Sequence, residues 1–252
     1  MTLADVGVFG GSGFYEFLDD VEEHQIGTPY GAPAAPVTIG ALDGVRVAFI
    51  PRHGRAHEFP PHAVPYRANV AAMRDLGVRA LLAPFAAGSL QPTIHPGDFV
   101  VVDQFVDRTS GRPETFYDTF DNGPTHVSLA DPYDAGLRAE LVAAADEQGI
   151  TVHDGGTVVV VQGPRFSTRA ESAWYRAQGW HVINMTQHPE AALACEAGIP
   201  YAGLALVTDY DTGLEGMPGV EPVTQEQVFG FFEDNVHRVR DLLFTAIPRL
   251  PR

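Results

Sequence analysis

Three runs of almost unbroken apolar residues constrain this fold more than any other feature of the sequence. They occupy residues 99–102, 158–161 and 201–207. Strands with this composition are buried on both faces, so helices must cover both sides of the sheet that holds them. Segments with helical spacing alternate with these runs. The pattern predicts an α/β fold, a three-layer sandwich around a mixed, largely parallel central sheet.

Shorter signals place the remaining elements. Further strands are predicted at 6–9, 37–39, 45–50, 81–84 and 182–183, and helices at 65–76, 134–148, from 169, from 188 and from 224 to 246. Thr168 with Glu171, and Thr224 with Gln227, form capping boxes at two of these helix starts. Loops are predicted at 112–121 and 214–222.

Composition limits the classes of function. No linker-like stretch divides the 252 residues, so one domain over 1–252 is predicted. The net charge of −16 argues against nucleic acid or an anionic membrane as partner. Cys195 is the only cysteine, which excludes an intramolecular disulfide and a cysteine zinc cluster. The first residues lack the pattern of a signal peptide and no apolar run has the length of a membrane span, so a cytoplasmic enzyme is expected.

Polar residues gather where predicted strands end. Gly10, Gly11, Ser12 and Gly13 follow the first strand, where backbone N–H groups and a hydroxyl suit an anion, although a plain tight turn fits them too. A second group follows the strand at 45–50. Its Arg52 and His53 offer donors for phosphate oxygens, although a basic loop on an acidic surface fits equally well.

Two carboxylates follow the run at 201–207. Asp209 and Asp211 share a face if the strand continues past Asp209. Like charge and burial raise the pKa of such a carboxyl, which then acts as a general acid near neutral pH. A polar loop that caps the strand is the alternative interpretation.

Longer motifs carry a resemblance to a known family. They read PRHGRAH at 51–57, DQFVDRT at 103–109, GPRFSTRAES at 163–172, NMTQHPEAALACEAGI at 184–199 and TDYD at 208–211. With them the chain resembles the trimeric purine nucleoside phosphorylase superfamily, on its 5′-methylthioadenosine phosphorylase branch. The likeness extends from Gly10 to the last helix.

The resemblance implies phosphorolysis of a purine nucleoside, most of all 5′-methylthioadenosine, with inorganic phosphate as co-substrate and no metal or organic cofactor. It implies the following site. Phosphate is bound by Ser12, Arg52, His53, the Ala86 N–H and Thr186; Asp209 protonates the purine, and Asp211 contacts its edge; His57, Phe166, Ser167, Met185 and Val228 surround base and sugar. It also implies a homotrimer in which His126 reaches the pocket of a neighbouring subunit, although a lone histidine is more often structural or exposed.

The chain departs from the family at two positions. Phe85 aligns with a threonine that binds phosphate, so a hydroxyl is lost there. Gln225 aligns with a valine of the methylthio branch, which predicts a hydrogen bond to a 5′-hydroxyl and some use of adenosine, unless Gln225 points to solvent.

Base preference follows from hydrogen-bond complementarity. Family members that act on 6-oxopurines pair a glutamate with an asparagine, and this chain has Ser167 and Asp209 at those places, which favours adenine. Helix capping is a second role for Ser167. Alternatives remain open: a general phosphorylase acting on adenosine or inosine, a nucleosidase or ribosyltransferase using another nucleophile, or a nucleoside-binding module without chemistry.

Overall fold

The computed structural model describes residues 3–11, 14–121, 123–212, 220 and 224–250. Ser12 and most of the loop predicted at 214–222 lie outside these ranges. The strands are β1 (Val6–Gly10), β2 (Glu22–His24), β3 (Val37–Leu42), β4 (Val45–Pro51), β5 (Ala80–Ser89), β6 (Phe99–Val101), β7 (Gln104–Arg108), β8 (Val152–Asp154), β9 (Thr157–Val161), β10 (Val182–Asn184) and β11 (Tyr201–Asp209). The helices are α1 (Tyr66–Asp75), α2 (Ala135–Glu147), α3 (Arg169–Ala177), α4 (Gln187–Glu196) and α5 (Gln225–Ala246), with short 3₁₀ turns at Pro61–Ala63 and Ile247–Arg249.

All of these strands join one mixed sheet. Its main path is β2-β3-β4-β1-β5-β10-β9-β7, while β11 pairs with β5 and β6, and β8 pairs with β6. The pairs β1–β4, β1–β5, β5–β11, β9–β10, β7–β9 and β6–β8 are parallel, and the others are antiparallel. The prediction of a mixed central sheet is confirmed.

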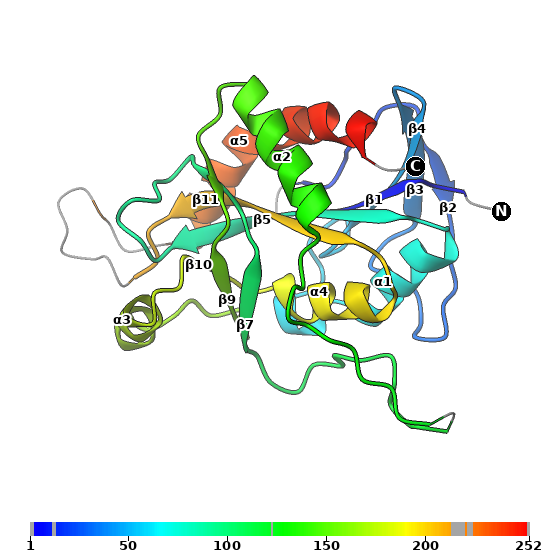
Figure 1. The fold of residues 1–252 in the computed structure, drawn as a ribbon, viewed down its shortest axis with the longest axis horizontal. Helices are drawn as coiled ribbons and strands as arrows, with labels where there is room; N and C mark the ends of the chain where they lie inside the picture. The colour runs from blue at the N-terminus through cyan, green and yellow to red at the C-terminus, as the bar shows by residue number, and fades with distance from the viewer. Residues whose placement is uncertain (1–2, 12–13, 122, 213–219, 221–223, 251–252) are drawn as a thin grey trace.

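Helices cover both faces of the sheet. In Figure 1, α2 and α5 lie on one side, and α1 and α4 lie on the other. Leu137 and Leu242 belong to the apolar core of the first side, and Met73 and Leu193 to that of the second. The three-layer sandwich expected from doubly buried strands is therefore present. None of the described helices is long and apolar enough to cross a membrane.

The strand β5 is longer than predicted, and one of its two edges is only partly paired with other strands. The predicted end of this strand at Pro84 is wrong: β5 continues to Ser89, because β11 pairs with it from Leu81 to Gly88. On the opposite edge, β1 pairs with β5 as far as Leu82, and β10 pairs only with Gly88 and Ser89. Since β10 runs antiparallel to β5, the carboxyl ends of β1 and β10 face each other across a gap in this edge.

Helix starts follow the predicted caps closely. Thr168 and Thr224 both form complete capping boxes, and the Asp134 side chain accepts from the Leu137 N–H. The start of α4 is less regular than predicted, because His188 has non-helical dihedrals (φ −112°, ψ 134°) and the regular turns begin at Pro189. The short strands β2, β7 and β8 were not predicted from the sequence.

Candidate active site

A cavity of about 330 Å³ lies at the gap beside β5. It is bordered by the ends of β1, β4, β9, β10 and β11, by β5 itself and by the start of α5. Most of the predicted site residues line it together. They are Arg52, His53, His57, Ala86, Phe166, Ser167, Met185, Thr186, Asp209, Asp211, Gln225 and Val228.

Two predicted site residues are not placed in this cavity. Ser12 lies outside the described residues. His126 is exposed on the long segment between β7 and α2, where its ring packs edge-on against Phe120 with centroids 5.6 Å apart. Within one chain His126 therefore contributes nothing to the cavity, and its predicted role in a neighbouring subunit stays a prediction.

Arg52 is a fully buried cation at the end of β4. Its Nε and Nη2 atoms donate to the two carboxylate oxygens of Glu190, at 2.6 and 2.8 Å, and the Tyr201 hydroxyl donates to the same carboxylate at 2.8 Å. Burial lowers the pKa of Arg52, but the charge and hydrogen bonds of Glu190 outweigh it and the pKa is raised. Nη1 makes only a long contact of 3.4 Å with the Pro84 carbonyl, so this atom is the one available to a ligand.

His53 is a neutral imidazole with a fixed tautomer. Its Nδ1 lies 2.8 Å from the Phe59 carbonyl, which only accepts, so Nδ1 carries the proton. Burial lowers the pKa of His53 to about 3, with Arg52 and His57 acting in the same direction. At neutral pH the Nε2 atom is therefore an acceptor, so the expectation that His53 donates a hydrogen bond to phosphate is wrong.

His57 stacks on His53 with ring centroids 4.4 Å apart and an interplanar angle of 6°. Its Nδ1 lies 3.0 Å from the Tyr15 hydroxyl, and Phe229 meets its ring edge-on. Its backbone has a positive φ of 55°, a conformation that non-glycine residues rarely adopt. Burial lowers the pKa of His57 as well.

The turn from β10 into α4 presents Met185 and Thr186 to the cavity. Asn184 Oδ1 accepts from the N–H groups of Thr186 and Gln187, at 2.7 and 2.8 Å, and Asn184 Nδ2 donates to the Thr186 hydroxyl oxygen at 3.3 Å. Because that oxygen accepts from Asn184, the hydroxyl hydrogen is free to point at an anion.

The carboxylates at the end of β11 do not share a strand face, because the condition for it fails and the strand does not continue past Asp209. β11 ends at Asp209, and Asp211 sits in a turn with φ 51°, where its N–H donates to Asp209 Oδ1 at 2.7 Å. Burial raises the pKa of Asp209. Burial, aided by the charge of Asp209, raises the pKa of Asp211 to about 6. Both carboxyls still line the cavity, held by a turn rather than by strand alternation.

Ser167 keeps its hydroxyl for the cavity. The cap of α3 is Thr168, so capping, the alternative role for Ser167, is wrong. Its Oγ is buried and has no hydrogen-bond partner among the residues that the structure describes. An orphaned buried hydroxyl is costly unless a ligand satisfies it.

The start of α5 closes one side of the cavity with Gln225, Val228 and Phe229. Val228 is half-buried, whereas Gln225 lies at the rim and is exposed. Gln225 thus lines the cavity and also meets solvent. Its hydrogen bond to a 5′-hydroxyl and its orientation toward solvent both stay predictions.

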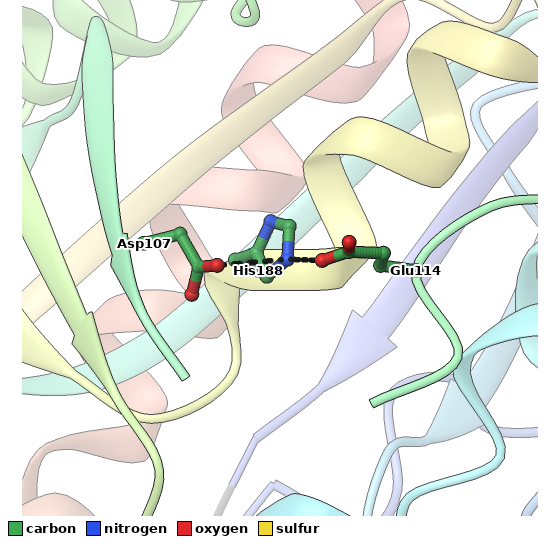
Figure 2. A group of neighbouring side chains, drawn as sticks. All are labelled: Asp107, Glu114 and His188. Atoms are coloured by element: carbon green, nitrogen blue, oxygen red, sulfur yellow. Dashed lines mark hydrogen bonds and ion pairs between the residues drawn. The ribbon is translucent and has the colours of Figure 1, made fainter. Parts of the chain in front are cut away.

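A separate group near the cavity joins Asp107, Glu114 and His188. Figure 2 shows the two carboxylates on either side of the imidazole, whose Nε2 lies 2.9 Å from Glu114 and 3.5 Å from Asp107. These ligand-type atoms lie within 4.8 Å of one another. The nitrogen that faces them is already hydrogen-bonded to Glu114, so we interpret the group as a contact that holds the 107–114 segment against α4.

No sequence pattern points to Arg112, which belongs to the loop predicted at 112–121. Arg112 is buried, and its guanidinium donates to the Met185, His188 and Gln162 carbonyls at 2.9, 2.6 and 2.8 Å. An arginine in a polar loop is usually exposed, and only the folded chain reveals that carbonyls surround this one.

Comparison with known proteins agrees with this geometry. Residues 5–248 match the family model described as the phosphorylase superfamily. The chain is 52% identical to a purine nucleoside phosphorylase of Streptomyces coelicolor, covering 98% of this chain and 90% of that protein. It is 53% identical to an S-methyl-5′-thioadenosine phosphorylase of Mycolicibacterium smegmatis, covering 96% of this chain and 90% of that protein. A solved methylthioadenosine phosphorylase from Schistosoma mansoni in complex with adenine is similar in structure, with a TM-score of 0.92, 38% identity and coverage of 98% and 91%.

Proposed function

Because the chain belongs to the phosphorylase superfamily, we propose that its cavity binds a purine nucleoside beside inorganic phosphate and transfers the sugar to phosphate. The preferred nucleoside is 5′-methylthioadenosine, and the products are adenine and 5-methylthioribose 1-phosphate. One observation carries this proposal: the donors lie beside β5 near Pro84 and Ala86, whereas the carboxyls of Asp209 and Asp211 lie beside Gly88, farther along the same strand. The apolar side chains of Phe166 and Met185 line the same cavity.

The donor end suits phosphate. Arg52 Nη1, the Thr186 hydroxyl and the Ala86 N–H supply hydrogen bonds to phosphate oxygens. His53 Nε2 accepts from a protonated phosphate oxygen, since its lone pair repels a bare one. Glu190 neutralises Arg52 within the protein, so binding relies on directed hydrogen bonds more than on net charge.

The carboxyl end suits the purine. As a phosphate oxygen bonds to C1′ of the sugar, the C1′–N9 bond breaks and its electron pair moves into the purine ring. Asp209 then gives its proton to N7, so neutral adenine leaves and Asp209 remains as a carboxylate. Asp211 and the unpartnered Ser167 hydroxyl contact the base edge. The sugar becomes cation-like in the transition state, and the adjacent phosphate stabilises that charge.

The test is release of free base from 5′-methylthioadenosine, adenosine and inosine, each with and without phosphate. We expect turnover to require phosphate and to be fastest with 5′-methylthioadenosine. Equal turnover without phosphate contradicts the proposal and identifies a nucleosidase. Faster turnover of inosine identifies a general purine nucleoside phosphorylase, the alternative that the Streptomyces relative favours.

The assembly is part of the proposal. We infer a homotrimer in the cytoplasm, acting in purine salvage, with no organic cofactor or metal. Exposed apolar side chains on the segment between β7 and α2 support a subunit contact there. They are Tyr117, Phe120, Val127 and Leu129. His126 belongs to the same segment, which suits a residue that completes a neighbouring cavity.

A further inference from the structure

Arg112 stands out as a buried cation in a segment whose neighbours are largely exposed. Burial of a charge is costly unless hydrogen bonds compensate for it. Burial lowers the pKa of Arg112, opposed by the nearby Tyr66 and Asp107. Nothing in the proposed chemistry uses this guanidinium, and it does not line the cavity.

The partners of Arg112 come from two separate loops. Nη1 donates to the Met185 and His188 carbonyls, in the turn that follows β10. Nη2 donates to the Gln162 carbonyl at 2.8 Å and more weakly to the Val161 carbonyl at 3.4 Å, where β9 ends. The planar fork of a guanidinium directs Nη1 to one loop and Nη2 to the other, whereas the three donors of an ammonium radiate from a single atom and do not reproduce this spacing.

Both loops form walls of the cavity. Val161 and Pro164 come from the first loop, and Met185 and Thr186 from the second. The loops also touch each other, since a side chain at Gly163 (φ 60°) would fall 2.6 Å from the Met185 sulfur. A shift of either backbone therefore moves groups that face the ligand.

The segment that carries Arg112 is itself fixed at several points. Gln162 bonds to both the N–H and the carbonyl of Ser110, at 3.0 and 2.9 Å. Glu114 bonds to His188 at 2.9 Å, as Figure 2 shows. The Thr115 hydroxyl and the Phe116 N–H donate to the carboxylate of Glu196 in α4, both at 2.7 Å.

We propose that Arg112 is a positioning residue that fixes the loop after β9 and the loop after β10 relative to each other. It thereby fixes the side chains of these loops that face sugar and phosphate. This inference rests on the proposed function for its kinetic consequences. Its structural part, the coupling of two loops by one guanidinium, is independent of which reaction the cavity performs.

The test is Arg112→Lys, with Arg108→Lys as the matched control. Arg108 lies over the exposed Trp174 ring, 4.9 Å from its centroid, and belongs to no part of the cavity. We expect Arg112→Lys to melt cooperatively, with kcat/KM for phosphate about 10- to 100-fold lower, since displacements near 1 Å reduce rates on this scale. Amide exchange should quicken in segments 161–166 and 184–188 and not elsewhere, and Arg108→Lys should match the wild type.

Wild-type kinetics and exchange in Arg112→Lys overturn the proposal. So does faster exchange spread evenly over the whole chain, which indicates general destabilisation. If Arg112→Lys does not fold, Glu114→Gln, at an exposed carboxylate, is measured instead. This variant should raise KM for phosphate about 3-fold and quicken amide exchange in 184–188. If neither quantity changes, the proposal is contradicted. If the wild type shows no phosphate-dependent turnover, the proposed function fails, and the exchange pattern alone decides the role of Arg112.

Discussion

Asp209 and Arg52 differ in where their partners lie in the sequence: those of Asp209 are its neighbours, whereas that of Arg52 is distant. Asp209 is flanked by the hydroxyl of Thr208 and the N–H of Asp211, at 2.7 Å each, while burial keeps its pKa raised. Arg52 meets Glu190 more than a hundred residues later in the chain. The phosphate-binding Arg52 is therefore held by a contact that no local motif contains, whereas the proton donor Asp209 is held within the motif at 208–211.

Asp209→Asn should lower kcat on 5′-methylthioadenosine by ~10²-fold, the usual scale for a general acid. The raised pKa means that the carboxyl keeps its proton to higher pH, so wild-type activity should fall as pH rises through that pKa. The amide has no such proton, so the variant should lack this decline. Pre-steady-state and steady-state rates across pH measure both effects. Asp154→Asn, at an exposed carboxylate, is the control, and an unchanged kcat in Asp209→Asn contradicts the assignment.

Arg52→Ala should weaken phosphate use by roughly 2–4 kcal/mol in kcat/KM. It also leaves Glu190 buried without its cation, which should lower the free energy of unfolding by about 3–5 kcal/mol. The double variant Arg52→Met with Glu190→Leu separates the effects, because it should recover stability and not phosphate use. Urea unfolding and KM for phosphate measure the two quantities. Recovery of both in the double variant shows that Arg52 serves only the fold.

Sequence patterns predicted which residues line the cavity better than they predicted which residues bond to them. Arg52, His53 and Asp209 were predicted because each follows an apolar run that must be a strand. Glu190 and Arg112 were missed because their roles arise from contacts between distant segments. Ser12 falls outside the described residues, so its predicted role is untested.

At the scale of elements, local chemistry and tertiary pairing contributed differently. The capping boxes of α3 and α5 involve residues three apart, so the sequence alone placed these helix starts correctly. The extent of β5 was misjudged because Pro84 and Gly88 suggest a break, while pairing with β11 keeps the strand extended. The short strands β2, β7 and β8 escaped prediction because three to five residues carry little periodic signal.

The first turn of α5 carries a prediction about specificity. If Gln225 turns from the rim into the cavity, it bonds a 5′-hydroxyl and narrows the preference for 5′-methylthioadenosine over adenosine. Gln225→Val should then widen the ratio of kcat/KM values by up to about tenfold, the value of one satisfied hydroxyl. Gln227→Val is unsuitable as a control because Gln227 caps the helix, so Glu226→Gln serves instead. Equal ratios in wild type and Gln225→Val mean that the side chain points to solvent.

At the scale of the whole molecule, one exposed segment carries apolar side chains that have no role within a single chain. The segment between β7 and α2 extends from the body of the molecule, as Figure 1 shows, and exposes half of Phe120. The chain is strongly acidic, with a net charge of −16, so an association must rely on apolar contacts that outweigh charge repulsion.

Phe120→Asp should convert the proposed trimer to monomers and reduce activity, because His126 no longer reaches a neighbouring cavity. Sedimentation velocity measures the assembly, and kcat/KM for 5′-methylthioadenosine measures the site. Val21→Asp places the same charge at another exposed apolar residue and should change neither quantity. A wild-type chain that sediments as an active monomer contradicts both the trimer and the role of His126.

The gap in the edge of β5 has a consequence for how this enzyme tolerates change. On that edge no strand pairs with β5 between Leu82 and Gly88, and within this interval the Ala86 N–H faces the unpaired edge, since Pro84 has no N–H. Connectivity, rather than the identity of a side chain, creates that donor, so the loss of the family's threonine at Phe85 leaves it in place. In saturation mutagenesis of Ala86, we therefore expect loss of activity with proline, which removes the N–H donor, and with side chains too large for the cavity. Replacement of Ala86 by another small residue should leave activity unchanged, because the strand connectivity, and not a side chain, supplies this donor.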